Sequence, residues 1–225
     1  YYYSRGGNPN QDGLAEALAA AEDGEAAAVC SSGMASILAG ILAVVQSGDH
    51  VIAADAIYGG TYGLLRNDLT KLGIATSFVD LNDPAAIQKA IRPETKLFVT
   101  EIATNPFVKI IDIDSVVALA HAAGAKVLVD NTFTTPCHIN PLQRGVDIVV
   151  HSATKFINGH NDVIAGVVVA SPDIVKAAKH VIASFGSVIS PFDAWLVLRG
   201  IKTMHLRVMK QSANALEVAA ALAKH

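Results

Sequence analysis

The chain has 225 residues, of which 52% are apolar and 16% charged, and its formal net charge is −3. This composition excludes a disordered tail, a collagen-like repeat and a polybasic nucleic-acid-binding protein. A chain of this length can bury one sizeable core without a metal or disulfide staple. We therefore expect one globular domain, or a large domain with an appendage, that does not bind nucleic acid.

Strand-like and helix-like segments alternate along most of the chain, which predicts βαβ crossovers and a mostly parallel sheet covered by helices. Continuous apolar runs, such as VLVD at residues 127–130, favour strands that are buried on both faces. Asp83-Pro84 and Ser171-Pro172 predict helix starts, and Gly73 and Gly124 predict helix ends. In chain order we expect strands at 27–30, 50–54, 75–79, 96–101, 126–130, 147–150 and 164–170, helices at 34–46, 62–72, 84–91, 115–123 and 172–184, and helical structure after about 190.

One charge-free stretch is long enough to cross a bilayer. No charged residue occurs between Glu25 and Asp49, and the segment 26–45 is apolar for most of its length. Ser31 to Gly33 interrupt it with small and polar residues, and its flanks lack basic anchors and aromatic belts. We therefore predict a short buried strand, a turn and a buried helix, with no membrane association.

Cysteine and histidine residues indicate neither a disulfide framework nor a metal site. Cys30 and Cys137 form no C-x-x-C motif and fit reduced thiols, so we expect a cytoplasmic protein. His151 and His160 lie nine positions apart without H-E-x-x-H or a carboxylate at ligand spacing. We interpret them as ordinary hydrogen-bonded histidines and predict no metal.

Ligands of open parallel sheets bind outside the carboxyl ends of the strands, so the residues after each expected strand are candidate site residues. These segments are 31–34, 55–61, 101–106, 130–132 and 151–155, and they are rich in hydroxyl groups and small residues. They contain no G-x-G-x-x-G and no G-x-x-x-x-G-K-[ST] motif, which disfavours a dinucleotide or Walker-type nucleotide site.

Lys155 is the sharpest candidate because it directly follows an apolar strand and should reach into the ligand crevice. Such a lysine is a clamp for an anion, a nucleophile with a lowered pKa, or simply a surface residue at a strand end. Asp130 ends another strand of the same layer, and a buried carboxylate needs a partner. A lysine, an aspartate and an anion cup at the helix start Ser32-Gly33-Met34 together suit pyridoxal phosphate.

A competing interpretation comes from Ser152-Ala153-Thr154-Lys155, which also fits the S-x-x-K motif of serine acyl-transfer enzymes. That chemistry needs a companion K-T-G element. Lys202-Thr203 is followed by Met204, so the companion is missing and this alternative is disfavoured.

A series of motifs occurs in order along the whole chain: YSRGGNP (3–9), SSGMA (31–35), YGGT (58–61), TNP (104–106), VDNTF (129–133), HSATK (151–155) with GH (159–160), and SPFDAW (190–195) through LRG (198–200). This series resembles the cystathionine γ-synthase / γ-lyase family of pyridoxal-phosphate enzymes, the Cys/Met metabolism enzymes. The resemblance implies the large domain of the aspartate-aminotransferase-like fold (fold type I). It also implies an N-terminal arm remnant at 1–15, a cofactor-binding domain at 16–190, and a connecting helix at 191–225 toward a further C-terminal domain.

Roles for individual residues follow from the resemblance alone. It makes Lys155 the Schiff-base lysine and proton carrier, and it pairs Asp130 with the cofactor's pyridine nitrogen. Asn105 would lie by the ring's phenolic oxygen, and Tyr58 would stack on the ring and act as an acid or base. The remaining implied residues bind phosphate, within the subunit (Gly33, Met34, Ser152, Thr154) or from a neighbouring subunit of a homotetramer built from two dimers (Tyr3, Arg5).

The implied activity is a carbon–sulfur lyase of sulfur amino-acid metabolism, with pyridoxal 5'-phosphate as cofactor and an amino acid as substrate. Two signals conflict over the substrate: Gly60 stands where methionine γ-lyases often have Cys, and Tyr2 where several cystathionine-specific members have an acidic residue. A γ-replacement enzyme (cystathionine γ-synthase or O-acyl-homoserine sulfhydrylase) is the alternative, and an inactive or incomplete cofactor-binding fragment is the alternative of another class. Departures from the family pattern at Asn10, Ala103 and Asn161 concern the subfamily rather than the cofactor.

Overall fold

A computed structural model describes residues 1–225, and its centre is one seven-stranded sheet in the order β1-β7-β6-β5-β4-β2-β3. Strands β2 to β6 are parallel, whereas β7 runs antiparallel to both of its neighbours, β1 and β6. The mostly parallel α/β sheet predicted from the sequence is confirmed. The strands are β1 (Ala26–Cys30), β2 (His50–Ala54), β3 (Ala75–Val79), β4 (Thr95–Glu101), β5 (Lys126–Asp130), β6 (Ile148–Ser152) and β7 (Gly166–Ala170).

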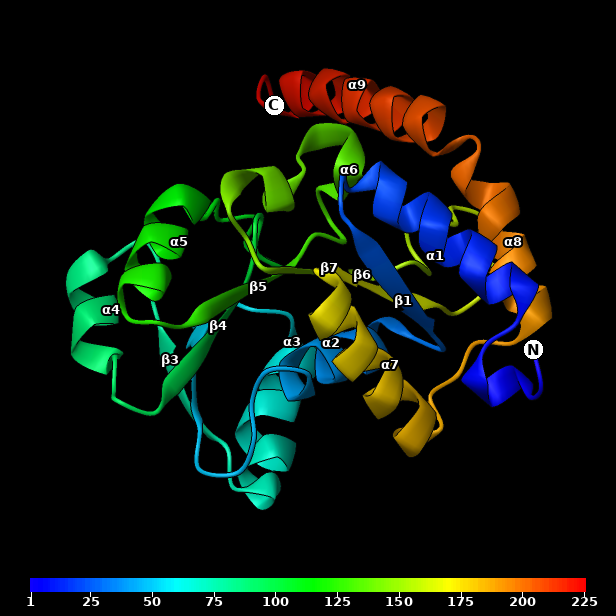
Figure 1. The fold of residues 1–225 in the computed structure, drawn as a ribbon. Helices are drawn as coiled ribbons and strands as arrows, with labels where there is room; N and C mark the ends of the chain where they lie inside the picture. Colours follow the sequence, from blue (N-terminus) through cyan, green and yellow to red (C-terminus); the bar gives the residue numbers. More distant parts are fainter.

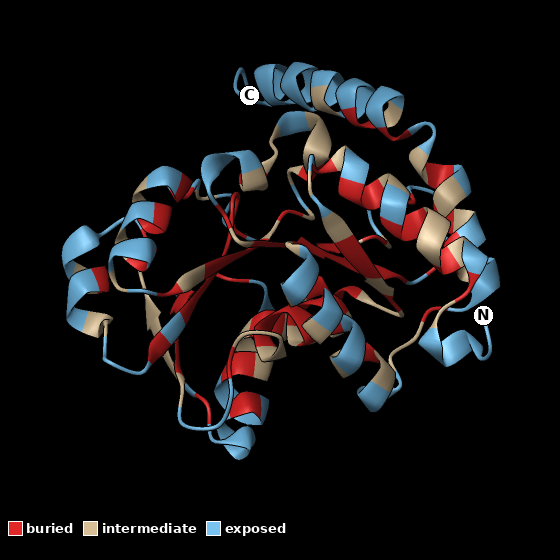
Figure 2. Cartoon of the chain, viewed as in Figure 1, coloured by how far each residue is buried: buried red, intermediate tan, exposed pale blue.

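Helices cover both faces of this sheet, with α2 and α7 on one face and α1 and α5 on the other (Figure 1). Burial on both faces explains why the central strands are continuous apolar runs (Figure 2). The helices are α1 (Pro9–Ala21), α2 (Gly33–Leu42), α3 (Gly59–Gly63), α4 (Pro84–Ala90), α5 (Ile113–Ala122), α6 (Thr135–His138), α7 (Pro172–Phe185), α8 (Pro191–Ile201) and α9 (Met204–Leu222), with single turns η1 (Ser4–Gly6), η2 (Leu64–Asp68), η3 (Leu69–Leu72) and η4 (Pro141–Arg144).

Local signals set several helix ends. The Asp83 side chain accepts hydrogen bonds from Ala85 N and Ala86 N at the start of α4, as expected of an N-cap. Ser171 precedes Pro172 at the start of α7 but makes no side-chain capping bond, so proline alone marks that start. The helix predicted over 62–72 is instead three short pieces, α3, η2 and η3, and Gly73 ends the last piece with φ 77°.

The charge-free stretch forms β1, a turn and α2, as the sequence predicts. Helix α2 packs against β6 and β7, where Gly40 lets its backbone approach Leu128 and Val150. Apolar side chains are therefore required on most sides of this helix. Among the helices of the structure, none combines the length and hydropathy that a membrane crossing needs.

Helix α1 is not among the helices that the sequence predicts, and its first residues lie within the segment 1–15 assigned to an N-terminal arm. Asn8 caps it by accepting hydrogen bonds from Asn10 N and Gln11 N, and Leu14 and Leu18 are fully buried. Residues 1–8 lie before this packed helix. At the other end, α9 lies along the outside of the domain and is exposed over most of its length (Figure 2).

Candidate functional site

The candidate site is a cavity of about 740 Å³ at the carboxyl ends of the parallel strands, where the sequence predicts it. Segments far apart in the chain meet there: the start of α2, the loops after β2 and β4, and the ends of β5 and β6. The sequence-predicted residues that line the cavity are Gly33, Met34, Tyr58, Asn105, Asp130, Ser152, Thr154 and Lys155, joined by Ser32, Glu101 and Thr132.

The start of α2 and the end of β6 form a close backbone contact at Gly33. Ser32 caps the helix by accepting a hydrogen bond from Ala35 N at 3.1 Å. A Cβ placed on Gly33 would lie 2.5 Å from Ser152 Cβ and 2.9 Å from Ser152 Oγ. Glycine is therefore required for this approach, which brings helix N–H groups and a serine hydroxyl together as an anion cup.

Thr154 also lines the cavity, but its hydroxyl already has partners within the chain. Thr154 Oγ1 donates to the Ala165 carbonyl at 3.2 Å and accepts from Ala165 N at 3.0 Å. These bonds tie the turn after β6 to the residue that precedes β7. The residue lies where the sequence predicts it, and a ligand would share a hydroxyl that also stabilises the turn.

Asp130 lies at the end of β5 and is held by Thr132. Its Oδ1 accepts hydrogen bonds from Thr132 N at 3.0 Å and from Thr132 Oγ1 at 2.5 Å, and Thr132 Oγ1 accepts from Ser152 N at 2.7 Å. Burial raises the pKa of Asp130, although the Thr132 bonds and the nearby His151 act in the opposite direction. A cationic partner supplied by a ligand would stabilise its charged form.

Glu101 is a site residue that the sequence analysis did not single out. It ends β4 in register with Asp130 on β5, is 6% exposed, and lines the cavity. Its Oε1 accepts a hydrogen bond from Tyr58 N at 3.1 Å, and its Oε2 accepts one from Asn105 N at 2.9 Å. Burial raises the pKa of Glu101 to about 7; the charge of Asp130 adds to this, and the two backbone bonds oppose it.

Lys155 follows β6 in a turn, where its N–H donates to the Ser152 carbonyl at 3.1 Å. The side chain lines the cavity and takes part in none of the salt bridges of the chain. The same cavity is lined by Tyr58, whose ring lies against Gly60, where a Cβ would be 2.6 Å from Tyr58 Cε1 and 3.0 Å from Met34 Sδ. An amine and an aromatic ring therefore face the same cavity.

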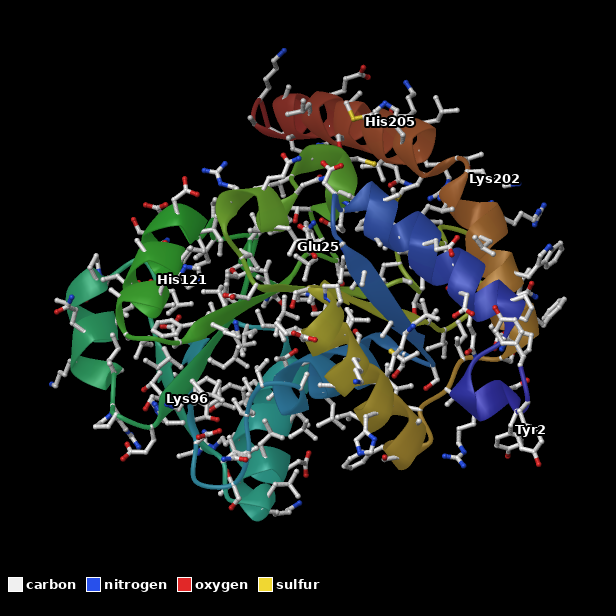
Figure 3. All side chains as sticks on the ribbon, in the orientation of Figure 1. Tyr2, Glu25, Lys96, His121, Lys202 and His205 are labelled. Carbon is white, nitrogen blue, oxygen red and sulfur yellow. The ribbon has the colours of Figure 1, made fainter.

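Tyr3 and Arg5 lie outside the cavity, in the N-terminal segment beside α7 (Figure 1). Arg5 Nη1 donates to the Ala183 carbonyl at 3.3 Å, and its guanidinium lies 5.5 Å from the centre of the Tyr3 ring. Figure 3 shows the neighbouring Tyr2 at the outer end of the molecule. Within one chain, these residues do not meet the other predicted site residues.

A buried acid–base pair lies behind the site, and the sequence analysis did not anticipate it. Glu22 caps α1, and its Oε1 accepts from His151 Nε2 at 2.5 Å and from Asn131 Nδ2 at 2.9 Å. The side chains of His151 and Glu22 are 1% and 2% exposed. His151 and Asn131 flank Val150 and Asp130, which are paired in register, so this network braces the strand ends that carry the site.

The donor set of the cavity fits pyridoxal phosphate. The glycine-dependent cup at Gly33 suits a phosphate group, the amine of Lys155 suits a covalent imine, and the buried carboxyl of Asp130 suits a protonated ring nitrogen. An exposed lysine without an ion-pair partner and a buried aspartate without a cation are each completed by such a ligand.

Comparison of the chain with known proteins finds enzymes that resemble it in sequence and in structure. The chain is 45% identical to L-methionine gamma-lyase of Porphyromonas gingivalis and 44% identical to cystathionine gamma-lyase of Bacillus subtilis; each alignment covers 100% of this chain and 57% or 59% of the relative. The chain thus spans less than two thirds of the length of these relatives. The solved structure of cystathionine gamma-lyase from Lactobacillus plantarum complexed with L-serine matches it with a TM-score of 0.96 at 37% identity, over 100% of this chain and 59% of that one. The model of the Cys/Met metabolism PLP-dependent enzyme family matches residues 1–225. The chain therefore belongs to the Cys/Met metabolism family of pyridoxal-phosphate-dependent enzymes, with the fold type I architecture that the sequence motifs imply.

Proposed function

We propose that the chain carries the cofactor site of a carbon–sulfur lyase that eliminates a thiol from a sulfur amino acid such as cystathionine, homocysteine or methionine. One observation carries the proposal: Lys155, Asp130 and the Gly33 cup, which come from separate parts of the chain, converge on one cavity. The relatives named gamma-lyases support the same reaction class.

The cofactor is held, in this proposal, by groups that already point to the cavity. The N–H groups of Gly33 and Met34 at the α2 start and the hydroxyls of Ser152 and Thr154 bind the phosphate. Asn105 and Tyr58 also line the cavity, where Asn105 would contact the phenolic oxygen of the ring and Tyr58 would stack on the ring.

Proton handling falls to three side chains. When bound, pyridoxal phosphate supplies an electron sink for charge that develops at the substrate α-carbon. The Asp130 carboxylate would keep the ring nitrogen protonated. The positive charge of the protonated nitrogen would in turn stabilise the charged form of this buried carboxyl. The Lys155 amine removes the proton from the substrate α-carbon, and Tyr58 transfers a proton at the substrate amine or at the departing sulfur.

The assembly and location of the protein are further parts of the proposal. Tyr3 and Arg5 lie away from the cavity of their own chain, which supports a role at the phosphate of a neighbouring subunit in a homotetramer. Both cysteines are free thiols, which supports a cytoplasmic location. We assign cofactor binding to 16–190 and a connecting role to 191–225, where α8 and α9 lie.

The cofactor assignment is tested by the visible absorption band of the imine in protein reconstituted with pyridoxal phosphate. We expect the band to form, to disappear on borohydride reduction, and to be absent in Lys155→Ala. Lys202→Ala, an exposed lysine labelled in Figure 3, is the matched control and should keep the band. A band that survives in Lys155→Ala contradicts the assignment.

The substrate is tested by measuring release of pyruvate and 2-oxobutanoate from cystathionine, homocysteine and methionine. Release of an oxo acid from one or more of them supports a lyase, and which oxo acid forms distinguishes β from γ elimination. Predominant thioether formation from an acylated homoserine and a thiol instead identifies a γ-replacement enzyme. Cofactor binding without either reaction identifies a cofactor-binding fragment.

A further inference from the structure

Two loops that carry proposed site residues are joined by one buried carboxylate. Tyr58 lies after β2 and Asn105 lies after β4, and the 43 positions between Tyr58 and Glu101 show that the link is tertiary rather than local. Glu101, the last residue of β4, accepts the backbone N–H of each: Tyr58 N at Oε1 and Asn105 N at Oε2. Each carboxylate oxygen thus serves a different loop.

We propose that Glu101 is a positioning residue of the active site, whose carboxylate fixes the Tyr58 and Asn105 loops relative to each other over the cofactor cavity. The proposal deepens the proposed function, because it takes from it the contacts of Tyr58 and Asn105 with the cofactor ring. Glu101 itself is not placed on the substrate or on the cofactor.

The chemistry of the two bonds requires a carboxylate. Two N–H donors converge on the side chain, so both of its terminal atoms must accept hydrogen bonds. A glutamine of the same shape offers one acceptor and one donor, so its NH₂ group would face a backbone N–H. Hydrogen bonds to a charged acceptor are also about twice as strong as bonds between neutral groups.

Glu101 lines the cofactor cavity together with Tyr58 and Asn105, the two residues whose loops it joins. Asp130 on β5 is in register with Glu101, and Tyr58 on the loop after β2 donates its backbone N–H to it. Lys155 after β6 is a further titratable group that lines the same cavity. Burial and Asp130 raise the pKa of Glu101 to about 7. Its two backbone bonds therefore gain charge assistance as the pH rises through neutrality, and the loop geometry is sensitive to the charge state of the site.

The first test needs no cofactor and follows the backbone amide resonances of Tyr58 and Asn105 by NMR between pH 5 and 9. We expect the two amides to shift together with one midpoint near the Glu101 pKa of about 7. In Glu101→Gln this titration should be lost from both. Glu94→Gln, an exposed acid just before the same strand, should leave it unchanged. Separate midpoints for the two amides, or a shared titration that survives in Glu101→Gln, overturn the proposal.

The second test measures pyridoxal phosphate affinity by equilibrium dialysis at pH 8. The loss of one charge-assisted bond predicts affinity about tenfold weaker in Glu101→Gln than in the unsubstituted chain or in Glu94→Gln. Thermal unfolding of each variant checks that it is folded. Unchanged affinity in a folded Glu101→Gln overturns the proposal. If the unsubstituted chain forms no imine, the proposed function fails, while the amide titration still decides the role of Glu101.

Discussion

The buried pair of Glu22 and His151 gives a sharp stability prediction. Glu22→Ala removes the carboxylate that accepts from His151 Nε2 and Asn131 Nδ2, and it leaves the imidazole buried without a partner on that side. Breaking a buried pair by removing one member costs about 3–5 kcal/mol. For a chain of this size each kcal/mol lowers Tm by roughly 2–4 °C. We therefore expect a Tm drop on the order of 10 °C.

A double-mutant cycle separates the pair from ordinary packing loss. Glu22→Leu with His151→Phe replaces both members by apolar side chains of similar size, and such replacements of buried pairs are often neutral or stabilising. We expect the double variant to be more stable than the sum of the single effects by about 2 kcal/mol or more, measured by urea unfolding. Glu16→Ala, an exposed acid on the same helix, is the control. Additive effects, or a Glu22→Ala cost below about 1 kcal/mol, refute the pair as a stabilising unit.

Two further predictions concern Gly33 in the anion cup and the buried side chain of His50. Gly33→Ala would place Cβ 2.5 Å from Ser152 Cβ, so we expect a cost of about 1–3 kcal/mol and weaker pyridoxal phosphate binding in dialysis, whereas Gly59→Ala, with open space around it, should change neither. Equal effects of the two substitutions would contradict a cup that requires glycine. Burial, with Arg92 nearby, lowers the pKa of His50 to about 4. Between the ordinary histidine pKa of 6.5 and the folded-state pKa of about 4, His50 binds a proton more readily in the unfolded chain than in the folded one. The free energy of unfolding should therefore decrease as the pH falls through that window. Urea midpoints measured against pH should show this slope, and His50→Gln should flatten it; an unchanged slope in that variant would assign it to other groups.

The sequence predicts a strand most accurately where a continuous apolar run coincides with burial on both faces of the sheet. The apolar runs at β2 and β5 are strands with the predicted bounds, because residues buried on both faces leave a continuous signature in the chain. Strand β3 also has the predicted bounds, although it lies at the sheet edge and none of its residues is fully buried. The residues at the carboxyl ends of parallel strands are candidate site positions because these ends meet at one edge of the sheet. Asp130, at the end of β5, and Lys155, after β6, line one cavity there. The family resemblance added roles that no pattern of polarity supplies.

Elements without such a signature were missed or displaced. Helix α1 begins at an Asn8-Pro9 signal that was legible, but its Ala-rich sequence has a weak apolar stripe, and its burial depends on β1 and α8. The helix predicted over 62–72 divides into three pieces of different hydrogen-bond spacing. Helical periodicity alone does not distinguish between these forms.

Local pattern and motifs are sufficient to predict the order of the strands, the residue types that follow them, the family and the place of the site. Which distant groups become partners depends on how the chain folds. Glu22 and His151 are 129 positions apart, and Glu101 joins loops that no local pattern connects. The physical reason is that a buried acid gains its partners from whatever the fold brings within hydrogen-bond distance, and local sequence carries no record of that approach.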